Sequence, residues 1–210
     1  MSELLPLFPL PTAVLFPNVF LPLHIFEPRY RQMVADALAG DRMIGMVLLR
    51  AGWQNEYEGR PSIYPIGCSG VITHVETLAD GRYNLVLRGL DRFRVVSEDH
   101  SRPYRRAEIE LLGDATVAPT HKTRLHEHRL RLEALIAQDA ERAAGHAAVT
   151  AAMPDEDLVN ALAQYLEFEP IEKQALLELE GPLSRAEALI ELLEMKLLLA
   201  RTPGGHHLAH

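Results

Sequence analysis

The sequence predicts an α+β protein in which a small barrel or strongly curved sheet with one helix precedes a helical bundle. Two observations favour this class: short apolar runs of strand character extend to about residue 112, and apolar residues recur at helical spacing in most of the chain beyond it. The 210 residues are 48% hydrophobic and 24% charged, which suffices for a folded core. We expect a β domain at residues 1–117, a helical domain at 118–201 and a flexible tail at 202–210.

The N-terminal stretch is strongly apolar but is interrupted by proline every few residues. A proline removes a backbone donor and breaks a helix, so this stretch cannot be one membrane-spanning helix. A signal peptide would begin with basic residues, whereas the only early charge is Glu3. We therefore expect short strand fragments that tolerate proline at their ends or at a sheet edge, with prolines separating the fragments. The prolines are Pro6, Pro9, Pro11, Pro17 and Pro22.

One helix is predicted at residues 28–39. Pro28 suits the first helical position, and the carboxylate of Glu27 lies at the positive end of the helix dipole. Gly40 is expected to end the helix. One face is apolar at Tyr30, Met33, Val34, Ala37 and Leu38.

Residues 42–112 show the pattern of several short strands. The nearly continuous apolar run at residues 43–49 is typical of a strand buried on both faces. Two alternating runs flank Asp80-Gly81, a dipeptide that favours a hairpin turn. The alternating segments DRFRVV and YRRAEIELL complete the set. Strands at this spacing favour a barrel or curved sheet over a parallel sheet with crossovers.

The chain after residue 113 predicts four helices with short connections. After the linker GDATVAPT, apolar residues recur at helical spacing over residues 121–144 and 155–168. Pro170 opens a third helix that ends near Gly181. Ser184 and Glu187 match the Ser-x-x-Glu capping box and predict the start of the last helix. Such an arrangement indicates a compact bundle.

Charge and cysteine content limit the classes of partner. A formal net charge of −8 argues against a nucleic-acid or anionic-membrane surface, because both depend on clustered lysine and arginine. The single cysteine, Cys68, excludes an internal disulfide and a zinc site built on paired cysteines. A reducing, cytoplasmic setting fits this composition best.

Several segments together resemble a known family. The opening LPLFPLPTAVLFPNVFLPLHIFEPRYRQMV is similar to the start of the Lon protease N-terminal domain, also called the Lon substrate-binding domain. The segments YPIGCSGVITHVE, YNLVLRGLDRFRVV, PYRRAEIELL and FEPIEKQALLELE follow in the family's order. Asn18 stands where the family usually has glycine, and Cys68 where it usually has threonine. Asparagine tolerates a positive φ, so we expect Asn18 to preserve the turn.

The resemblance implies a PUA-like β pseudo-barrel for the first part of the chain and a helical bundle for the second. It also implies a role in holding protein substrates or partners rather than in cutting them. None of the three lysines, Lys122, Lys173 and Lys196, follows a glycine, so no Gly-x-x-x-x-Gly-Lys phosphate loop is present. We expect a stand-alone member without the ATPase and protease domains, with no catalytic residue and no cofactor.

The segment Gly67-Cys68-Ser69-Gly70 resembles the nucleophile elbow of hydrolases, but the match is incomplete. The elbow pattern requires a glycine where Val71 stands, and it joins a strand to a helix, whereas the strand pattern continues here. We interpret the segment as a glycine-rich strand start or bulge, and Cys68 as a small buried thiol.

The histidines do not indicate a metal site. His121, His126 and His128 cluster in one predicted helix, but His126 lies on a different face and no cysteine supplements them. We interpret the three as part of a solvated helix face. His24 is interpreted as a structural histidine in a strand.

Arginines in two predicted strands form the one basic concentration of the chain. Arg88, Arg92 and Arg94 lie in one segment, and Arg105 and Arg106 lie in the next. In a PUA-like fold such a patch is the strongest feature in favour of RNA binding, and these first three are candidate binding residues. Acidic neighbours and a lack of exposed aromatic residues favour cross-strand ion pairs on the solvent face instead.

Residues 50–62 are the best candidate for a binding loop. This connection is long for one between strands, and it contains Trp53, the only tryptophan, and Tyr57. The two aromatics either anchor a partner or fold back as a lid over the barrel, and the sequence leaves both possibilities open.

Two functional hypotheses remain. The first is a recognition domain, linked to proteolysis, that binds unfolded polypeptide or a partner protein through hydrophobic or edge-strand contacts and performs no chemistry. The alternative is a PUA-like module that binds RNA or a small molecule through the arginine strands or a barrel-mouth pocket. Salt separates them, because nucleic-acid binding weakens steeply with salt whereas hydrophobic capture changes little.

Overall fold

The computed structural model describes residues 4–56, 59–113, 119–137 and 153–201. Contacts divide the chain into two compact units. The first comprises residues 1–113 and 160–178, and the second comprises residues 114–159 and 179–210. All six described strands belong to the first unit.

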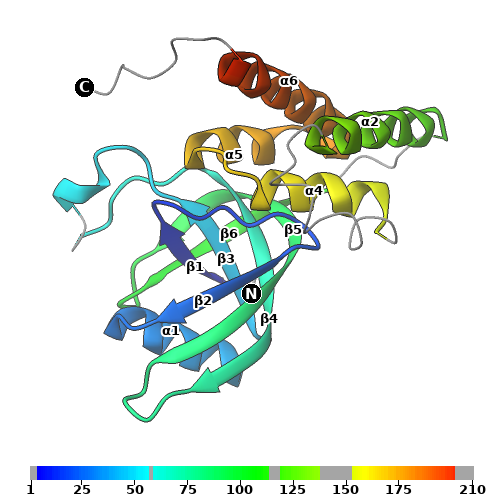
Figure 1. The fold of residues 1–210 in the computed structure, drawn as a ribbon. Coiled ribbons are helices and arrows are strands. Elements are labelled where there is room, and N and C mark those ends of the chain that lie inside the picture. The colour runs from blue at the N-terminus through cyan, green and yellow to red at the C-terminus, as the bar shows by residue number, and fades with distance from the viewer. Residues whose placement is uncertain (1–3, 57–58, 114–118, 138–152, 202–210) are drawn as a thin grey trace. The chain divides into compact units, whose positions relative to one another are not determined.

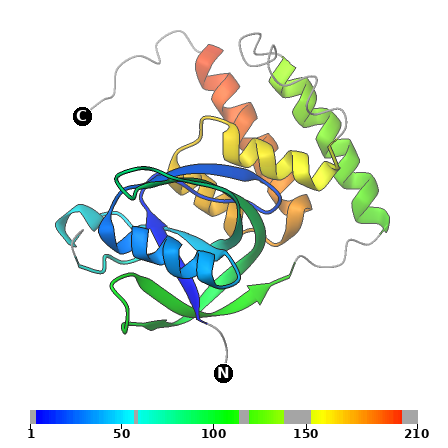
Figure 2. The same ribbon diagram turned by 90° about the horizontal axis from the view of Figure 1, so that it is seen from below.

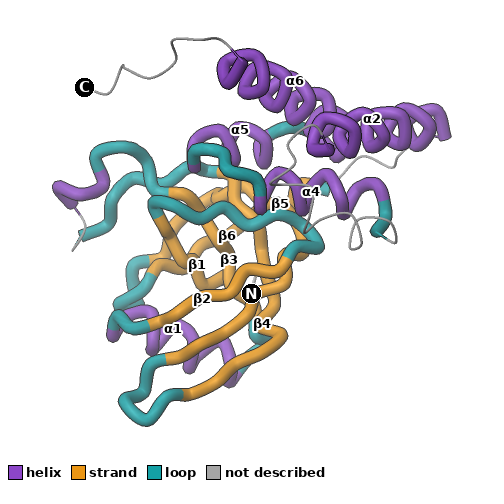
Figure 3. The backbone as a smooth tube through the Cα atoms, viewed as in Figure 1, coloured by secondary structure: helices purple, strands orange, loops and turns teal. Residues whose placement is uncertain are grey.

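The first unit is built on one mixed sheet (Figure 1, Figure 3). Its strands are β1 (Leu5–Leu10), β2 (Phe20–Ile25), β3 (Met43–Leu48), β4 (Ile66–Thr77), β5 (Tyr83–Asp99) and β6 (Arg105–Leu112). The order is β2-β5-β4-β3-β1-β6, and β5 also pairs with β6, so five strands form a closed ring of pairings to which β2 is attached. β1 and β3 run parallel, and the other described pairs are antiparallel. A mixed sheet with helices confirms the α+β class.

Prolines lie inside two strands as well as between strands. In the pairing register of β1, Pro6 is paired only with β6 and Pro9 only with β3. Each proline therefore has one side without a strand partner. On that side the sheet needs no N–H donor, so the proline nitrogen is tolerated. Pro22 lies in β2, at the edge of the sheet. Pro11 and Pro17 lie between strands, as predicted, and Pro22 lies in an edge strand, where proline is expected to be tolerated. Pro6 and Pro9 lie inside β1, so the prediction that they separate strands is wrong.

Helix α1 spans Pro28–Ala39, as predicted. Glu27 is its N-cap residue, and Gly40 ends it. The predicted apolar face is buried at Tyr30, Met33, Val34 and Ala37. The Tyr30 ring packs against Phe8 of β1 with 4.6 Å between ring centroids, so the start of α1 is fixed beside the sheet.

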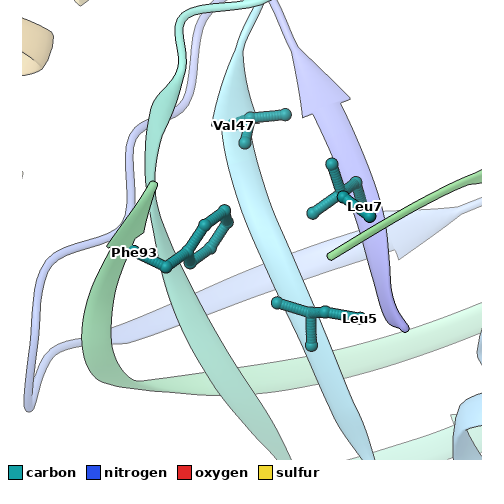
Figure 4. Close-up of a cluster of buried hydrophobic side chains, with 5 residues drawn as sticks. Leu5, Leu7, Val47 and Phe93 are labelled. Atoms are coloured by element: carbon teal, nitrogen blue, oxygen red, sulfur yellow. The ribbon is translucent and has the colours of Figure 1, made fainter. Parts of the chain in front are cut away.

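A cluster of buried apolar side chains joins four strands (Figure 4). Its members are Leu5, Leu7, Val47, Phe93 and Ala107. Gly67 of β4 lies against this cluster, because a Cβ atom there would stand 2.7 Å from the Phe93 ring and 2.4 Å from the Met46 carbonyl oxygen. A side chain at this position would displace the backbone, which explains the glycine.

The segment that resembles a nucleophile elbow lies inside β4. The register with β5 shifts between Cys68 and Gly70, as in a β-bulge. Cys68 is fully buried and donates to the Ser69 carbonyl oxygen. Ser69 Oγ donates to the Asp91 carbonyl oxygen at 3.0 Å and accepts from the Asp91 N–H. The interpretation as a bulge with a buried thiol is confirmed.

Two predicted turns are present. Gly81 has a φ of 79° in the connection between β4 and β5, where Asp80 Oδ1 accepts from the Arg82 N–H. Asn18 has a φ of 59°, and its N–H donates to the Gly89 carbonyl oxygen at 2.9 Å. Glycine and asparagine accept this left-handed conformation more readily than other residues, so both expectations are confirmed.

Residues 160–178 belong to the first unit and pack on the sheet. They comprise the second half of α4 (Asp155–Tyr165) and helix α5 (Pro170–Glu178). Four buried side chains hydrogen-bond main-chain groups here, and we call this set the α4–α5 seam. The bonds join Asn160 Nδ2 to the Pro17 carbonyl (3.0 Å), Phe16 N–H to Gln164 Oε1 (3.0 Å), Gln174 Nε2 to the Ile66 carbonyl (2.9 Å) and Arg92 Nη1 to the Leu177 carbonyl (3.2 Å).

The second unit pairs α2 (Pro119–Ala137) with α6 (Gly181–Arg201) (Figure 2). Ion pairs join the helices between Arg124 and Glu187, at 2.7 Å, and between Arg131 and Glu194. The predicted capping box is wrong, because α6 begins at Gly181 and Ser184 lies inside it. Positions 138–144 of the predicted helix at 121–144 lie outside the described residues. No helix in the described part of the chain is long and apolar enough to cross a membrane.

Candidate functional site

An open pocket of about 340 Å³ in the first unit is lined mainly by residues from three separate segments, with Pro9 and Leu49 in addition. The first turn of α1 contributes two residues, the connection before β4 contributes residues 59–61, and the start of β6 with the preceding turn contributes residues 102–105. We call it the arginine pocket. It is lined by Pro9, Arg29, Tyr30, Leu49, Gly59, Arg60, Pro61, Arg102, Pro103, Tyr104 and Arg105.

Guanidinium groups hold two segments of the arginine pocket together. Arg60 Nη1 donates to the Asp99 carbonyl oxygen at 3.3 Å, and its Nη2 donates to the Arg102 carbonyl oxygen at 3.2 Å. Arg105 Nη2 donates in the opposite direction, to the Pro61 carbonyl oxygen. The connection before β4 is therefore tied to the β5–β6 turn from both sides.

The described lining of the arginine pocket contains four arginines and no acidic residue. Three of the arginines have a carboxylate partner outside the lining: Arg29 with Glu27 at 3.0 Å, Arg102 with Asp36 at 3.7 Å and Arg105 with Glu98 at 2.8 Å. Arg60 donates instead to two neutral main-chain carbonyls. The pocket wall therefore carries a positive excess over the partners that the structure describes.

Arg105 is the buried member of this group, with 6% of its surface exposed. Burial lowers the pKa of Arg105; the Glu98 carboxylate opposes this change, and the like charge of Arg60 adds to the lowering. Two guanidinium groups thus repel each other in a partly dehydrated wall. An anion placed beside them would be attracted more strongly than on an open surface.

Tyr104 forms part of the wall between the arginine pocket and a second pocket of about 380 Å³. Its hydroxyl donates to Asp36 Oδ2 at 2.6 Å, and burial together with this bond raises the pKa of Tyr104 to about 12. The second pocket combines three carboxylates (Asp36, Asp41 and Asp91) with two arginines (Arg102 and Arg106) and with apolar side chains, so its wall has no positive excess. The two neighbouring pockets therefore differ in the charge of their walls.

The predicted binding loop adjoins the arginine pocket. Trp53 is half-buried in a short 3₁₀ helix, Trp53–Glu56, and Tyr57 lies outside the described residues. The same connection supplies Gly59, Arg60 and Pro61 to the pocket wall. The structure thus places the predicted loop at the pocket, although Trp53 itself is not one of its lining residues.

The three predicted strand arginines do not form one open patch. Arg88 is exposed, and its Nη2 donates to Asn18 Oδ1 at 3.1 Å. Arg94 pairs across strands with Glu110 at 2.9 Å, which confirms the predicted solvent-face ion pair at this position. Arg92 is 4% exposed and belongs to the α4–α5 seam, so the solvent-face interpretation is wrong there.

Sequence reasoning missed most of the pocket wall. Arg29, Arg60 and Arg102 lie far apart in the sequence, and no local pattern connects them. Tyr30 was predicted only as part of the apolar face of α1. One available signal was the long connection at residues 50–62, which predicted the neighbourhood of the pocket but not its chemistry.

The β2 edge is poorly suited to the addition of a further strand. The Phe20 carbonyl oxygen accepts from Gln164 Nε2 at 3.1 Å and from the Tyr165 hydroxyl at 2.7 Å. Pro22, two residues later, has no N–H to offer. A contact from α4 at Phe20 and a proline two residues later therefore interrupt this edge, as is common where a sheet is protected against unwanted pairing.

Two histidines of α2 lie near carboxylates. His126 Nδ1 is 3.2 Å from Asp155, and His128 Nε2 is 3.5 Å from Glu187. His24 of the first unit hydrogen-bonds Asn84 at 2.7 Å. Within the residues that the structure describes, no group of three or more His, Cys, Asp or Glu side chains is arranged to hold a metal ion.

Comparison with sequence families and curated proteins gives one consistent result. The model of the "ATP-dependent protease La (LON) substrate-binding domain" matches residues 4–195. Lon protease 2 of Myxococcus xanthus is 28% identical over 197 residues, which are 92% of this chain and 24% of that protein. Lon protease 2 of Sorangium cellulosum is 32% identical over 117 residues, which are 55% of this chain and 14% of that protein. The chain spans about a quarter of the length of the curated relatives that it matches along most of its own length.

Solved structures share the fold. The N-terminal domain of a Mycobacterium avium complex Lon protease superposes with a TM-score of 0.69 at 16% identity, covering 91% of this chain and 98% of that one. A Lon N-terminal domain protein from Xanthomonas campestris superposes with a TM-score of 0.59 at 23% identity, covering 96% and 99%. At these identities the likeness establishes the fold alone.

Proposed function

The chain belongs to the family of Lon substrate-binding domains, and from this premise we propose that it is a non-catalytic protein-recognition domain. It binds unfolded polypeptide segments or a partner protein, and its binding is linked to proteolysis. The binding surface comprises the connection at residues 50–62 and the arginine pocket. The setting is cytoplasmic, which the single and buried Cys68 supports.

One observation carries this proposal: the predicted binding loop and the arginine pocket are continuous. Residues 59–61 belong to both, and Trp53 precedes them in the same connection. The pocket volume of about 340 Å³ is within the range of sites that hold a small ligand or a few side chains. A half-buried tryptophan in the connection that also lines the pocket is suited to anchor an apolar side chain.

The absence of catalysis by this chain is supported by the two residues that most resemble nucleophiles. Ser69 is 2% exposed, and its hydroxyl already bonds the Asp91 main chain. Cys68 is fully buried. A nucleophile needs access to substrate and an adjacent base, and neither buried side chain has such access. We expect purified protein neither to hydrolyse ATP nor to cleave casein.

The finer architectural assignments are part of the same proposal. The closed ring of strand pairings supports a PUA-like pseudo-barrel in residues 1–117. The ion-paired helices α2 and α6 support a helical bundle within residues 118–201, although residues 160–178 of that range belong by contacts to the first unit. The predicted tail at residues 202–210 lies outside the described residues.

A second candidate function is binding of a small anionic molecule or RNA. The observation in its favour is the positive wall of the arginine pocket. The strand arginines add little to it, because Arg92 is buried and Arg94 is paired with Glu110. Polypeptide binding therefore remains the preferred function.

A binding titration tests the proposal. The Trp53→Ala, Tyr57→Ala double variant is titrated with unfolded, dephosphorylated casein beside the unaltered protein, whose Kd we expect in the micromolar range or above. Phe26→Ala is the matched control, because Phe26 is an exposed aromatic residue that lines neither pocket. We expect at least about a fivefold rise in Kd for the double variant alone. Equal affinity in all three proteins would place the surface elsewhere, and steep salt weakening together with RNA binding would favour the second candidate.

A further inference from the structure

We propose that the arginine pocket is a carboxylate-recognition subsite, so that the polypeptides bound by this chain present an acidic side chain or their C-terminal carboxylate next to an apolar residue. This inference deepens the proposed function and depends on it. It specifies the chemical class of the bound segment.

The described lining of the arginine pocket carries an excess of positive charge. Four guanidinium groups line one concave site, and the carboxylates that balance three of them lie outside the lining. The guanidinium of Arg60 is held between two main-chain carbonyls, which orient the group without neutralising it. A planar, oriented guanidinium is the side chain best matched to a carboxylate, because its donors form a fork with the spacing of the two oxygens.

Two of the pocket arginines, Arg60 and Arg105, are partly or almost fully buried. Arg105 is almost fully buried, and Arg60 is close enough to disfavour its charge. An incoming carboxylate would relieve this repulsion while replacing little water around Arg105. Such an interaction is worth more than a salt bridge between fully exposed side chains.

The remaining lining indicates a neighbouring apolar group. Pro9, Leu49, Pro61 and Pro103 contribute apolar surface, and the Tyr30 ring lies under the Arg29 guanidinium at 4.7 Å. A site that combines such surface with oriented cations suits an amphipathic ligand. A carboxylate beside an apolar side chain has this character.

The same features favour polypeptide over nucleic acid as the source of the anion. Proteins that track a phosphate backbone spread their cations along a groove and usually interleave aromatic stacking surfaces. Here the arginines converge on one pocket of about 340 Å³, in a chain with a net charge of −8. One anionic group, rather than a series of phosphates, fits this arrangement.

Three peptides of equal length test the proposal. The first has an internal Glu beside Leu and an amidated C-terminus, the second has Gln in place of Glu and a free C-terminus, and the third has Gln and an amidated C-terminus. We expect the first or the second to bind about tenfold more tightly than the third, and the tighter one identifies the source of the carboxylate. One ion pair should also give a much shallower salt dependence than nucleic-acid binding.

Arginine variants connect this preference to the pocket. Arg60→Gln should abolish most of the preference for a carboxylate, and Arg102→Gln, which changes a half-exposed side chain, should reduce it. Arg82→Gln is the matched control, because Arg82 is an exposed, ion-paired arginine that lines neither pocket. We expect unchanged preference in this control.

The outcomes separate the inference from the proposed function. Equal affinity for all three peptides, with unfolded casein still bound, would overturn carboxylate recognition and leave polypeptide binding intact. A preference that persists in both pocket variants would also overturn the assignment of the subsite. No binding of casein or of any peptide, with RNA bound in an Arg60-dependent manner, would overturn both.

Discussion

Two regions of the first unit use polar side chains to bond main-chain carbonyls, but with opposite results. In the α4–α5 seam, Arg92 reaches the Leu177 carbonyl at the end of α5, and the chain's own helix covers the site. In the arginine pocket, Arg60 donates to the carbonyls of Asp99 at the end of β5 and of Arg102 in the following turn, and the wall stays open. An arginine is therefore a binding candidate only where the chain leaves space in front of it.

The largest expected effect on stability comes from a substitution in the α4–α5 seam. Arg92→Ala removes the donor to the Leu177 carbonyl and leaves a cavity in a buried position. We expect the free energy of unfolding to fall by about 2–4 kcal/mol. Urea unfolding followed by the fluorescence of Trp53, the only tryptophan, reports the first unit. A loss below about 0.5 kcal/mol would mean that the seam does not depend on this arginine.

A smaller effect on stability is expected in the loop at Pro17 and Asn18, which hydrogen-bonds to the α4–α5 seam. Asn18 has a φ of 59° next to Pro17, whose carbonyl accepts from Asn160. A β-branched residue is strained in this conformation, so Asn18→Val should lower the free energy of unfolding by about 1–2 kcal/mol. Asn18→Gly is the matched control and should stay within about 0.5 kcal/mol. Equal urea midpoints for both variants would contradict the strain argument.

On the open side, Tyr104 allows a test by pH. Tyr104→Phe removes the hydrogen bond to Asp36 and should cost about 1 kcal/mol at pH 7. The pKa of Tyr104 rises from 10.0 to about 12 on folding, so its neutral form is favoured in the folded state. The associated stabilisation is complete below pH 10 and is lost as the pH rises toward 12.

Unfolding curves from pH 8 to 11 therefore distinguish the two proteins. The difference in stability between the unaltered protein and Tyr104→Phe should be constant up to about pH 9.5 and should then narrow. A constant difference over the whole range would show that folding does not change the pKa of this tyrosine.

The smallest effect is expected at Arg94, two positions from Arg92 on the same strand. Its ion pair with Glu110 is about half exposed, with 50% and 58% of the two side chains accessible. Exposed pairs contribute little, so Arg94→Gln should change the free energy of unfolding by less than about 0.5 kcal/mol. A loss as large as that of Arg92→Ala would remove the distinction between the two arginines.

The fold was predictable where local signals determine it. Pro28, Gly40 and Asp80-Gly81 are local signals, and the structure confirms the helix and the hairpin that they predict. The start of α6 was not predictable in this way. Ser184 and Glu187 match the capping-box pattern, but both lie inside the helix. Here the turn at Gly181, with a φ of 79°, sets the start instead.

The candidate site was predictable only in part, because its members meet through tertiary structure. The length and aromatic content of residues 50–62 indicated a binding loop. The alternating pattern of β5 predicts the same environment for Arg92 and Arg94. In the structure, Arg92 is buried against α5, whereas Arg94 is half exposed to solvent. The pocket arginines come from separate segments whose proximity depends on the strand pairings.

Hydrogen exchange on binding reports directly whether polypeptide contacts the arginine pocket and the connection at residues 50–62. The protein is compared with and without saturating unfolded, dephosphorylated casein, and amide protection is mapped by mass spectrometry. We expect increased protection in residues 27–31, 50–64 and 99–106, around the arginine pocket, and no change in residues 160–178. Protection confined to β5 around Arg88 and Arg94 or to α4 and α5, with none at the pocket segments, would contradict this expectation.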